Sequence, residues 1–254
     1  MPLFGLIGFP LTHSCSSAYF TEKFRRENLS GYNYRLFPLK DPSGIRKLLD
    51  QNPGLCGLNV TIPLKETIMP FLDEFDEQST KAGAVNTIKI GWEHNRQKLT
   101  GYNTDIDGFL SSADFSSFSH ALILGTGGAS NAIAYSLKKL GIRFILVSRK
   151  PTFPNSLSYH ELDREIVSRH TLIINTTPVG MFPKTGNYPP IPYEYLTANH
   201  MLYDLIYNPE ETLFLQKGRE MGSLTQNGLN MFFAQANFSY QIWAHPVFPR
   251  YPQG

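Results

Sequence analysis

The fold of this chain is indicated most clearly by one stretch, His120-Ala121-Leu122-Ile123-Leu124-Gly125-Thr126-Gly127-Gly128-Ala129-Ser130. Its apolar residues predict a short buried strand, its glycines predict a tight turn, and the pattern of Asn131–Leu140 predicts a helix directly afterwards. Gly141 is suited to end that helix, because glycine readily adopts the left-handed conformation found there. Strand, glycine-rich turn and helix in this order are typical of a dinucleotide-binding βαβ unit.

Working outward, strand and helix candidates alternate along most of the chain, which predicts an α/β protein with parallel sheets. The expected strands are Leu3–Gly8, Tyr32–Leu39, Gly57–Thr61, Thr87–Ile90, Ala121–Leu124, Phe144–Val147, Leu172–Ile174 and Met201–Leu205. The expected helices are Ser16–Glu27, Pro42–Asp50, Phe75–Lys81, Asn131–Leu140, one beginning near Asp105, and Asn230–Trp243. Asp41 and Ser16 are candidate N-caps, and the proline-rich Pro151–Ser158 is expected to be irregular.

The composition suits a soluble globular enzyme, with 254 residues of which 41% are hydrophobic and 17% charged. A net charge of +2 predicts no strong attraction to nucleic acid or acidic membranes. No apolar run approaches the roughly 20 residues that span a bilayer, and the first residues lack the basic region of a signal peptide. Cys15 and Cys56 are too few for a disulfide framework and have no metal-like spacing, so we expect free thiols, no metal and a cytoplasmic location.

The next predicted strand ends in Ser148-Arg149-Lys150, with no acidic residue. NAD sites usually place Asp or Glu about 20 residues after the glycine turn, where it accepts from the ribose 2′-hydroxyl. A basic pair at this place favours a 2′-phosphate instead, and therefore NADP. A solvated basic turn is the alternative interpretation, and Ser130 stands at the third glycine position of the fingerprint.

Three segments supply groups for proton chemistry. Lys65 ends the run Asn59-Val60-Thr61-Ile62-Pro63-Leu64-Lys65, Asn86 lies in Gly83–Thr87, and Asp105 ends Gly101–Asp105. One lysine, one aspartate and neutral hydrogen-bond groups can hold a polyhydroxylated molecule and move a proton on it. Beside a dinucleotide site, this equipment predicts alcohol–ketone redox chemistry. Taken singly, Lys65 is more typical of an ordinary surface lysine, and Asp105 is equally typical of a helix N-cap.

The ordered set of motifs resembles the shikimate dehydrogenase family, from Gly5 to the end of the last predicted helix. The resemblance rests on seven segments, which are Gly8–Ser16, Asn59–Lys65, Gly83–Thr87, Asn103–Asp105, Asn175–Met181, Tyr203–Pro209 and Gly228–Gln235. It implies reversible NADPH-dependent reduction of 3-dehydroshikimate to shikimate by a monomer or homodimer. It also implies an α/β substrate domain of residues 1–104, completed by a C-terminal helix within 226–254, and a Rossmann-like NADP domain of residues 105–225, with an active-site cleft between them.

The resemblance also implies roles for individual residues. Lys65 and Asp105 would transfer and orient the proton, whereas His13 is expected to make a structural hydrogen bond. Shikimate would be held by Ser14, Ser16, Asn59, Thr61, Lys65, Asn86, Asp105, Tyr207 and Gln235, although buried hydrogen bonding also explains Tyr207 and Gln235. NADP would be surrounded by Gly125, Thr126, Gly127, Gly128, Ala129, Ser148, Arg149, Lys150, Leu205 and Gly228.

The chain departs from the family pattern at Cys15, Ser17 and Asn131, and its segment between Lys150 and His170 is short. The alternatives are a quinate/shikimate dehydrogenase relative that accepts NAD, and a nucleotide-binding regulator that has lost catalysis. A hydrolase or transferase on the same plan has no support, because the chain has neither a Gly-x-Ser-x-Gly elbow nor a Gly-x-x-x-x-Gly-Lys-Ser/Thr loop.

Overall fold

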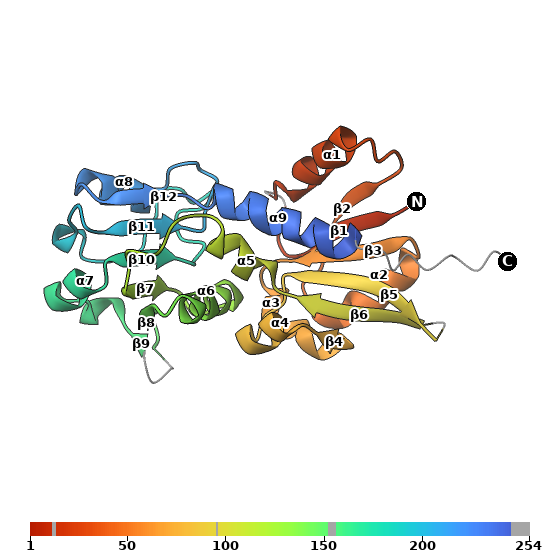
Figure 1. Ribbon diagram of the computed structural model, residues 1–254, viewed down its shortest axis with the longest axis horizontal. Helices are drawn as coiled ribbons and strands as arrows, with labels where there is room; N and C mark the ends of the chain where they lie inside the picture. The colour runs from red at the N-terminus through yellow and green to blue at the C-terminus, as the bar shows by residue number, and fades with distance from the viewer. Residues whose placement is uncertain (12–13, 95, 152–155, 245–254) are drawn as a thin grey trace. The chain divides into compact units, whose positions relative to one another are not determined.

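The computed structural model describes residues 1–11, 14–94, 96–151 and 156–244. The chain divides into two compact units, coloured red to yellow and green to blue along most of their length in Figure 1. The first unit comprises Met1–Thr104 and the chain from Ala236 onward, and the second comprises Asp105–Gln235. Each unit is built on one six-stranded sheet. The last helix, α9 (Leu229–Ala244), therefore contributes residues to both units.

The first sheet is mixed, with the strand order β2-β1-β3-β5-β6-β4. Its strands are β1 (Leu3–Gly8), β2 (Asn33–Pro38), β3 (Leu55–Val60), β4 (Glu74–Phe75), β5 (Thr87–Glu93) and β6 (Arg96–Tyr102). Strands β1, β2 and β3 are parallel, but β5 is antiparallel to both β3 and β6. The prediction of parallel sheets is therefore wrong for this half of the first sheet. Strands β5 and β6 are joined by a short connection, which permits only antiparallel pairing. Strand β6 was not predicted, because Leu99 is its one buried aliphatic residue.

The helices of the first unit cover both faces of this sheet. They are α1 (Ser16–Arg26), α2 (Ile45–Gln51), α3 (Leu64–Thr67) and α4 (Glu77–Ala82), with single 3₁₀ turns η1 (Pro42–Gly44) and η2 (Met69–Phe71). One core contains Ile7 and the buried residues of α2 and α3. The other contains Phe4, Leu6 and Phe20 together with Trp243 from the end of α9. Neighbouring residues of β1 thus serve opposite faces, as the alternation of a strand requires.

Three predicted helix starts in this unit have different outcomes. Asp41 caps η1 as predicted, because its carboxylate accepts from the Ser43 N–H at 2.9 Å. Ser16 is not a cap: α1 begins at Ser16 itself, and Ser14 Oγ accepts from the Ser16 N–H at 3.2 Å. The helix expected over Phe75–Lys81 begins at Glu77, because Phe75 belongs to β4 and Asp76 caps α4.

The second sheet is parallel throughout, with the order β12-β11-β10-β7-β8-β9. Its strands are β7 (His120–Leu124), β8 (Arg143–Val147), β9 (Ser156–Leu157), β10 (Leu172–Asn175), β11 (Met201–Asp204) and β12 (Leu224–Gln226). Numbered along the chain, this is the 3-2-1-4-5-6 order of the Rossmann fold, read from the β9 edge. The predicted Rossmann-like fold is confirmed. The prediction of an irregular segment over Pro151–Ser158 is wrong at Ser156 and Leu157, because these residues form β9 and pair with β8.

Helices cover both faces of the second sheet as well. They are α5 (Thr104–Leu110), α6 (Gly128–Lys139), α7 (Arg164–Arg169), α8 (Leu213–Glu220) and the start of α9, with the 3₁₀ turns η3 (Tyr159–Glu161) and η4 (Tyr193–Tyr195). One core includes residues of α5, α6 and α9, and the other includes residues of α7 and α8. Gly141 follows α6 with φ +72°, as predicted for the end of that helix. Asp105 lies inside the first turn of α5 rather than before it.

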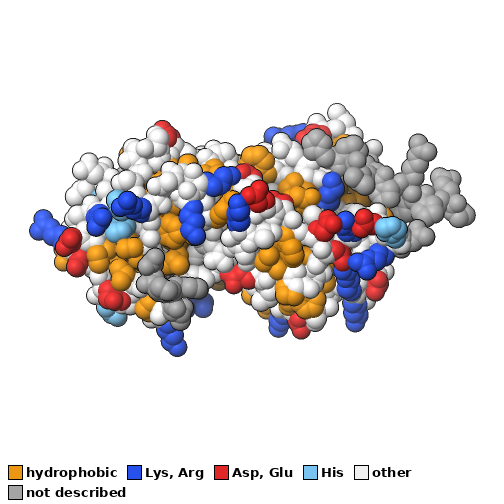
Figure 2. Space-filling model, turned by 60° about the horizontal axis from the view of Figure 1, so that its bottom comes forward, with side chains coloured by type: hydrophobic (Ala, Val, Ile, Leu, Met, Phe, Trp, Pro, Cys, Tyr) orange, Lys and Arg blue, Asp and Glu red, His pale blue; other side chains and the backbone are white. Residues whose placement is uncertain are grey.

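The distribution of charged side chains on the surface agrees with the small net charge of the sequence. On the face shown in Figure 2, basic and acidic side chains both occur and hydrophobic side chains lie among them. No single sign of charge therefore covers that face. Within the part of the chain that the structure describes, none of the helices has the length and apolar character needed to cross a bilayer.

Candidate active site

The carboxyl ends of the parallel strands in the second sheet place the predicted nucleotide-binding residues. Strand β7 is the first in chain order, and its neighbours β8 and β10 continue the sheet in opposite directions. The strand order therefore reverses between β7 and β10. In open α/β sheets, the crevice beyond the carboxyl ends at such a point is where ligands bind. Gly125 directly follows β7, and Thr176 directly follows β10, so the predicted glycine turn lies at this point.

The glycine turn is fixed by close backbone contacts. The Gly125 N–H donates to the carbonyl of Val147 at 2.8 Å, and its φ of +118° is one that residues with a side chain rarely adopt. A Cβ at Gly125 would stand 2.6 Å from Thr176 Oγ1, which itself donates to the Leu124 carbonyl at 2.7 Å. The turn thus holds β7 and the loop after β10 together. Gly127 precedes α6, whose first N–H groups are available to an anion such as a pyrophosphate.

Two buried hydroxyls near the turn have no hydrogen-bond partner in the described part of the protein. They are Ser130 Oγ, in the first turn of α6, and Ser148 Oγ, at the end of β8. Burying a hydroxyl without a partner is unfavourable, so both positions fit a site that a polar ligand completes. Arg149 and Lys150 follow Ser148 and are exposed. A dinucleotide with a 2′-phosphate matches this set of groups, because the residues supply hydroxyls, helix N–H groups and cations.

The loop after β11 packs against the turn before α9. A Cβ at Gly228 would stand 2.1 Å from the Leu205 carbonyl oxygen, and the Gly228 N–H donates to Ile206 at 3.1 Å. The ring of Tyr207 lies 4.7 Å from that of Phe232, measured between centroids. The second unit therefore brings together three of the predicted residues, Leu205, Tyr207 and Gly228.

Asp204 organises this loop from inside the core. It is fully buried, and its carboxyl accepts from Thr212 Oγ1 at 2.6 Å, Asn175 Nδ2 at 3.0 Å and the Ile206 N–H at 3.0 Å. Burial raises the pKa of Asp204 to about 7, against the opposing effect of these three donors. The residue thus ties the ends of β10 and β11 to the cap of α8. Sequence reasoning included Asp204 in a motif but gave it no role.

Gln235 and Asp105 also belong to the second unit. A Cβ at Gly108 would stand 2.8 Å from the Cβ of Gln235, so α5 and α9 make close contact at that point. Gln235 Nε2 donates to the Phe232 carbonyl at 3.0 Å. Asp105 is 6% exposed and lies three residues before Gly108, nearly one turn along α5. The second unit therefore places Gln235 against the helix that carries Asp105.

In the first unit, the segments after β1 and β3 lie against each other. The Thr61 N–H donates to the Ile7 carbonyl and the Phe9 N–H donates to Ile62, each at 2.9 Å. Gly8 permits this approach, because a Cβ there would stand 2.5 Å from the Thr61 side chain and its φ is +151°. The Lys65 carbonyl accepts from the Val85 N–H at 2.7 Å, which joins the lysine's turn to the Gly83–Thr87 segment.

A buried polar network lies beside these segments. Asn59 is 6% exposed; its Oδ1 accepts from the Tyr34 hydroxyl at 2.8 Å, and its Nδ2 donates to Ser239 Oγ at 2.9 Å. Asn86 is 3% exposed; its Oδ1 accepts from the Thr104 N–H at 2.7 Å, and its Nδ2 donates to Thr104 Oγ1 at 3.0 Å. The backbones of β3, β5 and the start of α5 are fixed relative to one another by these bonds.

The network includes four residues that sequence reasoning missed, namely Tyr34, Thr87, Thr104 and Ser239. The hydroxyl of Ser239 lies 2.7 Å from Thr87 Oγ1 and 3.0 Å from Thr104 Oγ1, and the side chain is fully buried. A signal was available for Ser239, because Ala236, Ser239 and Trp243 share one face of a helix by their 3–4 spacing. All three are buried. Ser239 is thus a polar residue on a core-facing stripe.

The predicted substrate residues therefore form two groups. Ser14, Ser16, Asn59, Thr61, Lys65 and Asn86 belong to the first unit, and Asp105, Tyr207 and Gln235 belong to the second. Ser14 and Ser16 follow β1 on the same carboxyl edge from which Thr61 and Lys65 follow β3. Lys65 is partly buried in α3. His13 lies outside the described residues.

The first part of the chain matches a known protein family. Residues 6–88 match the family model described as the shikimate dehydrogenase substrate binding domain. A shikimate dehydrogenase (NADP(+)) from Desulforamulus reducens is 34% identical over 267 residues, which cover 94% of this chain and 88% of that protein. This chain belongs to the shikimate dehydrogenase family. Its members are oxidoreductases that act on a CH–OH group, and so is this protein.

Solved structures support the membership across both units. Shikimate dehydrogenase 1 from Peptoclostridium difficile superimposes with a TM-score of 0.84 at 36% identity, covering 98% of this chain and 94% of that one. A shikimate dehydrogenase in complex with NADP+ gives a TM-score of 0.81 at 31% identity, with 96% and 90% coverage. Quinate dehydrogenase from Corynebacterium glutamicum, in complex with NAD, gives 0.82 at 26% identity, with 96% and 93% coverage. These two relatives therefore differ in the nucleotide bound and in the substrate for which they are named.

Proposed function

We propose that this protein is an NADP-dependent shikimate dehydrogenase that interconverts 3-dehydroshikimate and shikimate in the cytoplasm. One observation carries the proposal: a Rossmann-order sheet with a glycine turn at its switch point shares the chain with a sheet whose carboxyl edge holds Thr61 and Lys65. Membership of the shikimate dehydrogenase family supports it. The division of the chain into a substrate domain of residues 1–104 with 226–254 and a cofactor domain of residues 105–225 is part of the same proposal.

The cofactor assignment rests on the end of β8 and on the glycine turn. Gly125, Thr126, Gly127, Gly128 and Ala129 would receive the pyrophosphate, and Ser148, Arg149 and Lys150 the 2′-phosphate. When bound, NADPH would supply the hydride for reduction of the ketone carbon. A guanidinium and an ammonium next to a hydroxyl suit a phosphate better than a ribose hydroxyl. Leu205 and Gly228, which contact each other, would lie beside the cofactor.

The substrate assignment rests on hydroxyl and amide groups at the edge of the first sheet. Ser14, Ser16, Thr61 and Asn86 would bind the hydroxyls and carboxylate of shikimate, with Tyr207 and Gln235 added from the second unit. Asn59 is proposed to bind shikimate as well. Its amide also bonds to Tyr34, Thr87 and Ser239 within the first unit and would hold these side chains in place.

Lys65 and Asp105 are proposed to manage the proton. Reduction of a ketone leaves negative charge on its oxygen, and an ammonium at that oxygen can donate the proton; in the reverse direction the neutral amine accepts it. Lys65 is the lysine of the motif on the substrate edge. Asp105 would accept a hydrogen bond from a substrate hydroxyl and orient the substrate.

The test of this mechanism is a set of lysine variants assayed at 340 nm. We expect Lys65→Ala to lower kcat roughly 10²- to 10⁴-fold, the range of a general acid–base group. Lys47→Ala is the matched control, because Lys47 is an exposed lysine on α2, and it should retain wild-type turnover. Near-wild-type kcat in the Lys65 variant would refute the assignment.

The cofactor preference is tested with Arg149→Gln. Hydrogen bonds to charged groups contribute about 1.5–3 kcal/mol each, so the KM for NADPH should rise about tenfold or more. The KM for NADH should stay unchanged, because NADH has no 2′-phosphate. Arg164→Gln, an exposed arginine at the start of α7, should alter neither value.

The second candidate is a quinate/shikimate dehydrogenase that accepts NAD, favoured by the likeness to the quinate dehydrogenase bound to NAD. Parallel assays with shikimate or quinate and with NADP⁺ or NAD⁺ separate the two. Strong activity with shikimate and NADP⁺ supports the first proposal, whereas activity only with quinate or NAD⁺ supports the second. Absence of turnover with all four pairs would indicate the regulator that binds nucleotide without catalysis.

A further inference from the structure

A pocket lies within the second unit, beside strands β7, β8 and β9 and the end of helix α7. It has a volume of about 360 Å³, and six of its lining residues matter here: His120, Arg143, Ile145, Leu157, Arg169 and His170. His120 and Arg143 are paired at the amino ends of β7 and β8. Gly125 and Ser148 lie five residues further along the chain, just past the carboxyl ends of the same strands and roughly 16 Å away at about 3.3 Å per residue. The charged end of the pocket is therefore distant from the proposed cofactor residues, whereas Leu157 at the other end accepts from the Ser148 N–H at 2.9 Å through its carbonyl.

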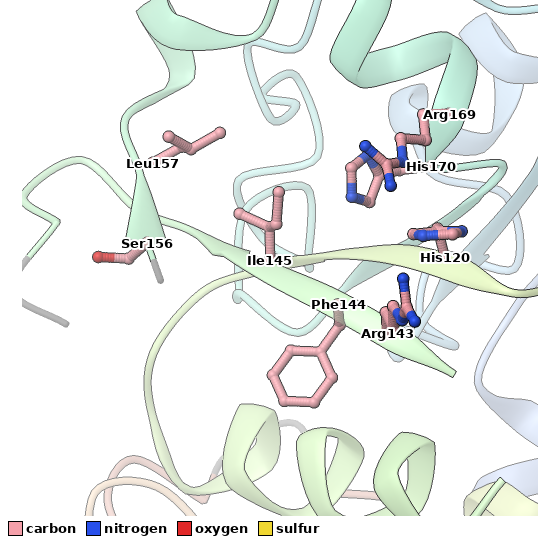
Figure 3. A pocket seen from close by; sticks show the side chains of 8 residues that line it. All are labelled: His120, Arg143, Phe144, Ile145, Ser156, Leu157, Arg169 and His170. Atoms are coloured by element: carbon pink, nitrogen blue, oxygen red, sulfur yellow. The ribbon is translucent and has the colours of Figure 1, made fainter. Parts of the chain in front are cut away.

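One end of the pocket carries positive charge without a compensating acid. Figure 3 shows the side chains of His120, Arg143, Arg169 and His170 gathered at this end. The residues that line the pocket include no aspartate or glutamate. Among the described residues, neither Arg143 nor Arg169 makes a side-chain ion pair. Guanidinium groups without a partner favour a carboxylate or phosphate, which they bind through paired N–H donors.

The two histidines lie beside the arginines, and one of them has a ring nitrogen without a hydrogen-bond partner in the described part of the protein. Nδ1 of His170 donates to the Ile166 carbonyl at 2.7 Å, and the two imidazole rings lie 5.5 Å apart, nearly perpendicular. Nε2 of His120 is buried and has no hydrogen-bond partner in the described part of the protein. Burial lowers the pKa of both histidines, and Arg169 and Arg143 lower that of His120 further. The lowered pKa favours the neutral form of both rings.

The other end of the pocket is mainly apolar, with the hydroxyl of Ser156 as its polar side chain. Ile145 and Leu157 lie there, on the sheet face that α7 covers, and Phe144 borders the pocket from β8 (Figure 3). A bare inorganic anion would fill only the charged end and leave these side chains in contact with water. A small organic anion would use both ends, since ligand pockets combine apolar walls with a few polar groups that fix orientation. The volume is in the range of pockets that hold small molecules, about 300–1,000 Å³.

We propose that this pocket binds a small carboxylate carried on a compact apolar body. The carboxylate lies between Arg143 and Arg169, and the apolar body lies against Ile145 and Leu157. The site is a second binding site of the protein, and its charged end lies at the amino ends of β7 and β8. Its ligand takes no part in the redox step.

The test uses phenylacetate as the probe on the full-length protein, with binding measured by isothermal titration calorimetry. We expect saturable binding at one site, weakened at least tenfold in the double variant Arg143→Gln/Arg169→Gln. Arg164→Gln is the matched control, since it removes an exposed arginine of α7 that does not line the pocket, and it should bind like the wild type. Both arginines of the double variant are exposed, so circular dichroism should show an unchanged fold.

A second readout locates the ligand. Histidine NMR titrations should show the pKa of His120 rising when phenylacetate is added, because the carboxylate offsets the field of the two arginines. Equal binding of 2-phenylethanol would overturn the role of charge, and equal binding of inorganic phosphate would overturn the role of the apolar wall. Absence of saturable phenylacetate binding, or undiminished binding by the double variant, would overturn the site itself.

Discussion

At the scale of single residues, Ser239 connects the end of the chain to the edge of the first sheet. Its hydroxyl bonds with Asn59, and lies within hydrogen-bonding distance of Thr87 and Thr104. Ser239→Ala would remove one buried hydrogen-bond partner from each of Asn59, Thr87 and Thr104, and a lost hydrogen bond costs about 0.5–1.5 kcal/mol. We expect urea unfolding to show a lower free energy of unfolding. The KM for shikimate should rise, because Asn86 would be held less firmly. The KM for NADPH should not change.

The control for this variant is Gln241→Ala. Gln241 is exposed on the same helix, so its removal tests helix α9 without touching the network. Ser239→Thr, which restores a hydroxyl, should recover part of the lost affinity for shikimate. A Ser239→Ala protein with wild-type stability and wild-type KM values would show that the network does not support the site.

Asp204 leads to a prediction about how the stability of the folded protein depends on pH. Its folded-state pKa, about 7, lies above the ordinary value of 3.8. Between these two values the unfolded chain is ionised there and the folded chain is protonated, so the folded state loses stability as pH rises. The loss is at most about 4 kcal/mol over this interval, at 1.36 kcal/mol for each pH unit.

The measurement is urea unfolding of the wild type and Asp204→Asn at several pH values between 4 and 8. The asparagine variant has no carboxyl at this position, so its stability should fall less steeply over that interval. Identical pH slopes in the two proteins would mean that the folded-state pKa of Asp204 is close to the ordinary one. Carbon NMR of the carboxyl gives the folded-state midpoint directly.

At the scale of elements, two glycines next to the proposed cofactor differ in what a methyl group would meet. At Gly228 the added Cβ would lie 2.1 Å from the backbone oxygen of Leu205, so the turn before α9 must shift. Gly127, before α6, has an extended backbone with φ −99° and no atom within 4 Å of its added Cβ. We expect Gly228→Ala to lower stability by about 1–3 kcal/mol, the usual cost of overpacking. Gly127→Ala should fold normally.

Thermal unfolding with and without NADPH separates the two effects. Gly127→Ala should keep the melting temperature of the free protein but lose much of the stabilisation by NADPH, because its methyl group would occupy the space where the pyrophosphate approaches. Gly228→Ala should melt at a lower temperature in both conditions. Unchanged stabilisation of the Gly127 variant by NADPH would count against the proposed position of the pyrophosphate.

An element can be predicted from the sequence when its signal lies within a few neighbouring residues. Strands β1 and β7 were found because a run of apolar residues ends at Gly8 or Gly125, and both signals lie within a few neighbouring residues. Strand β6 was missed because polar residues surround Leu99. The contact of Asn59 with Ser239 joins residues 180 positions apart. No local pattern specifies which distant partner a buried amide will find.

At the scale of the whole molecule, the first unit is discontinuous in sequence. Its core is completed by Trp243 near the end of α9, which is 4% exposed and stacks on Phe4 with ring centroids 4.9 Å apart. The Trp243 Nε1 donates to the Ile88 carbonyl at 3.0 Å, and a Cβ at Gly57 would stand 2.3 Å from the same nitrogen. The indole therefore fills a space that the absence of a side chain at residue 57 leaves open. Sequence reasoning predicted that the last helix completes this domain, but it could not identify Gly57 as the contact.

Trp243→Ala should consequently weaken one unit more than the other. Removing a buried tryptophan costs about 3–5 kcal/mol, and here the lost contacts are with Phe4, Gly57 and Ile88 of the first unit. Hydrogen exchange should become faster in peptides covering β1, β3 and β5, while peptides covering β7, β10 and β11 keep their protection. Gln241→Ala should leave both sets unchanged. Equally faster hydrogen exchange in both sheets would contradict this prediction. It would mean that the chain unfolds as a single cooperative unit and that α9, which contributes to both cores, couples their stabilities.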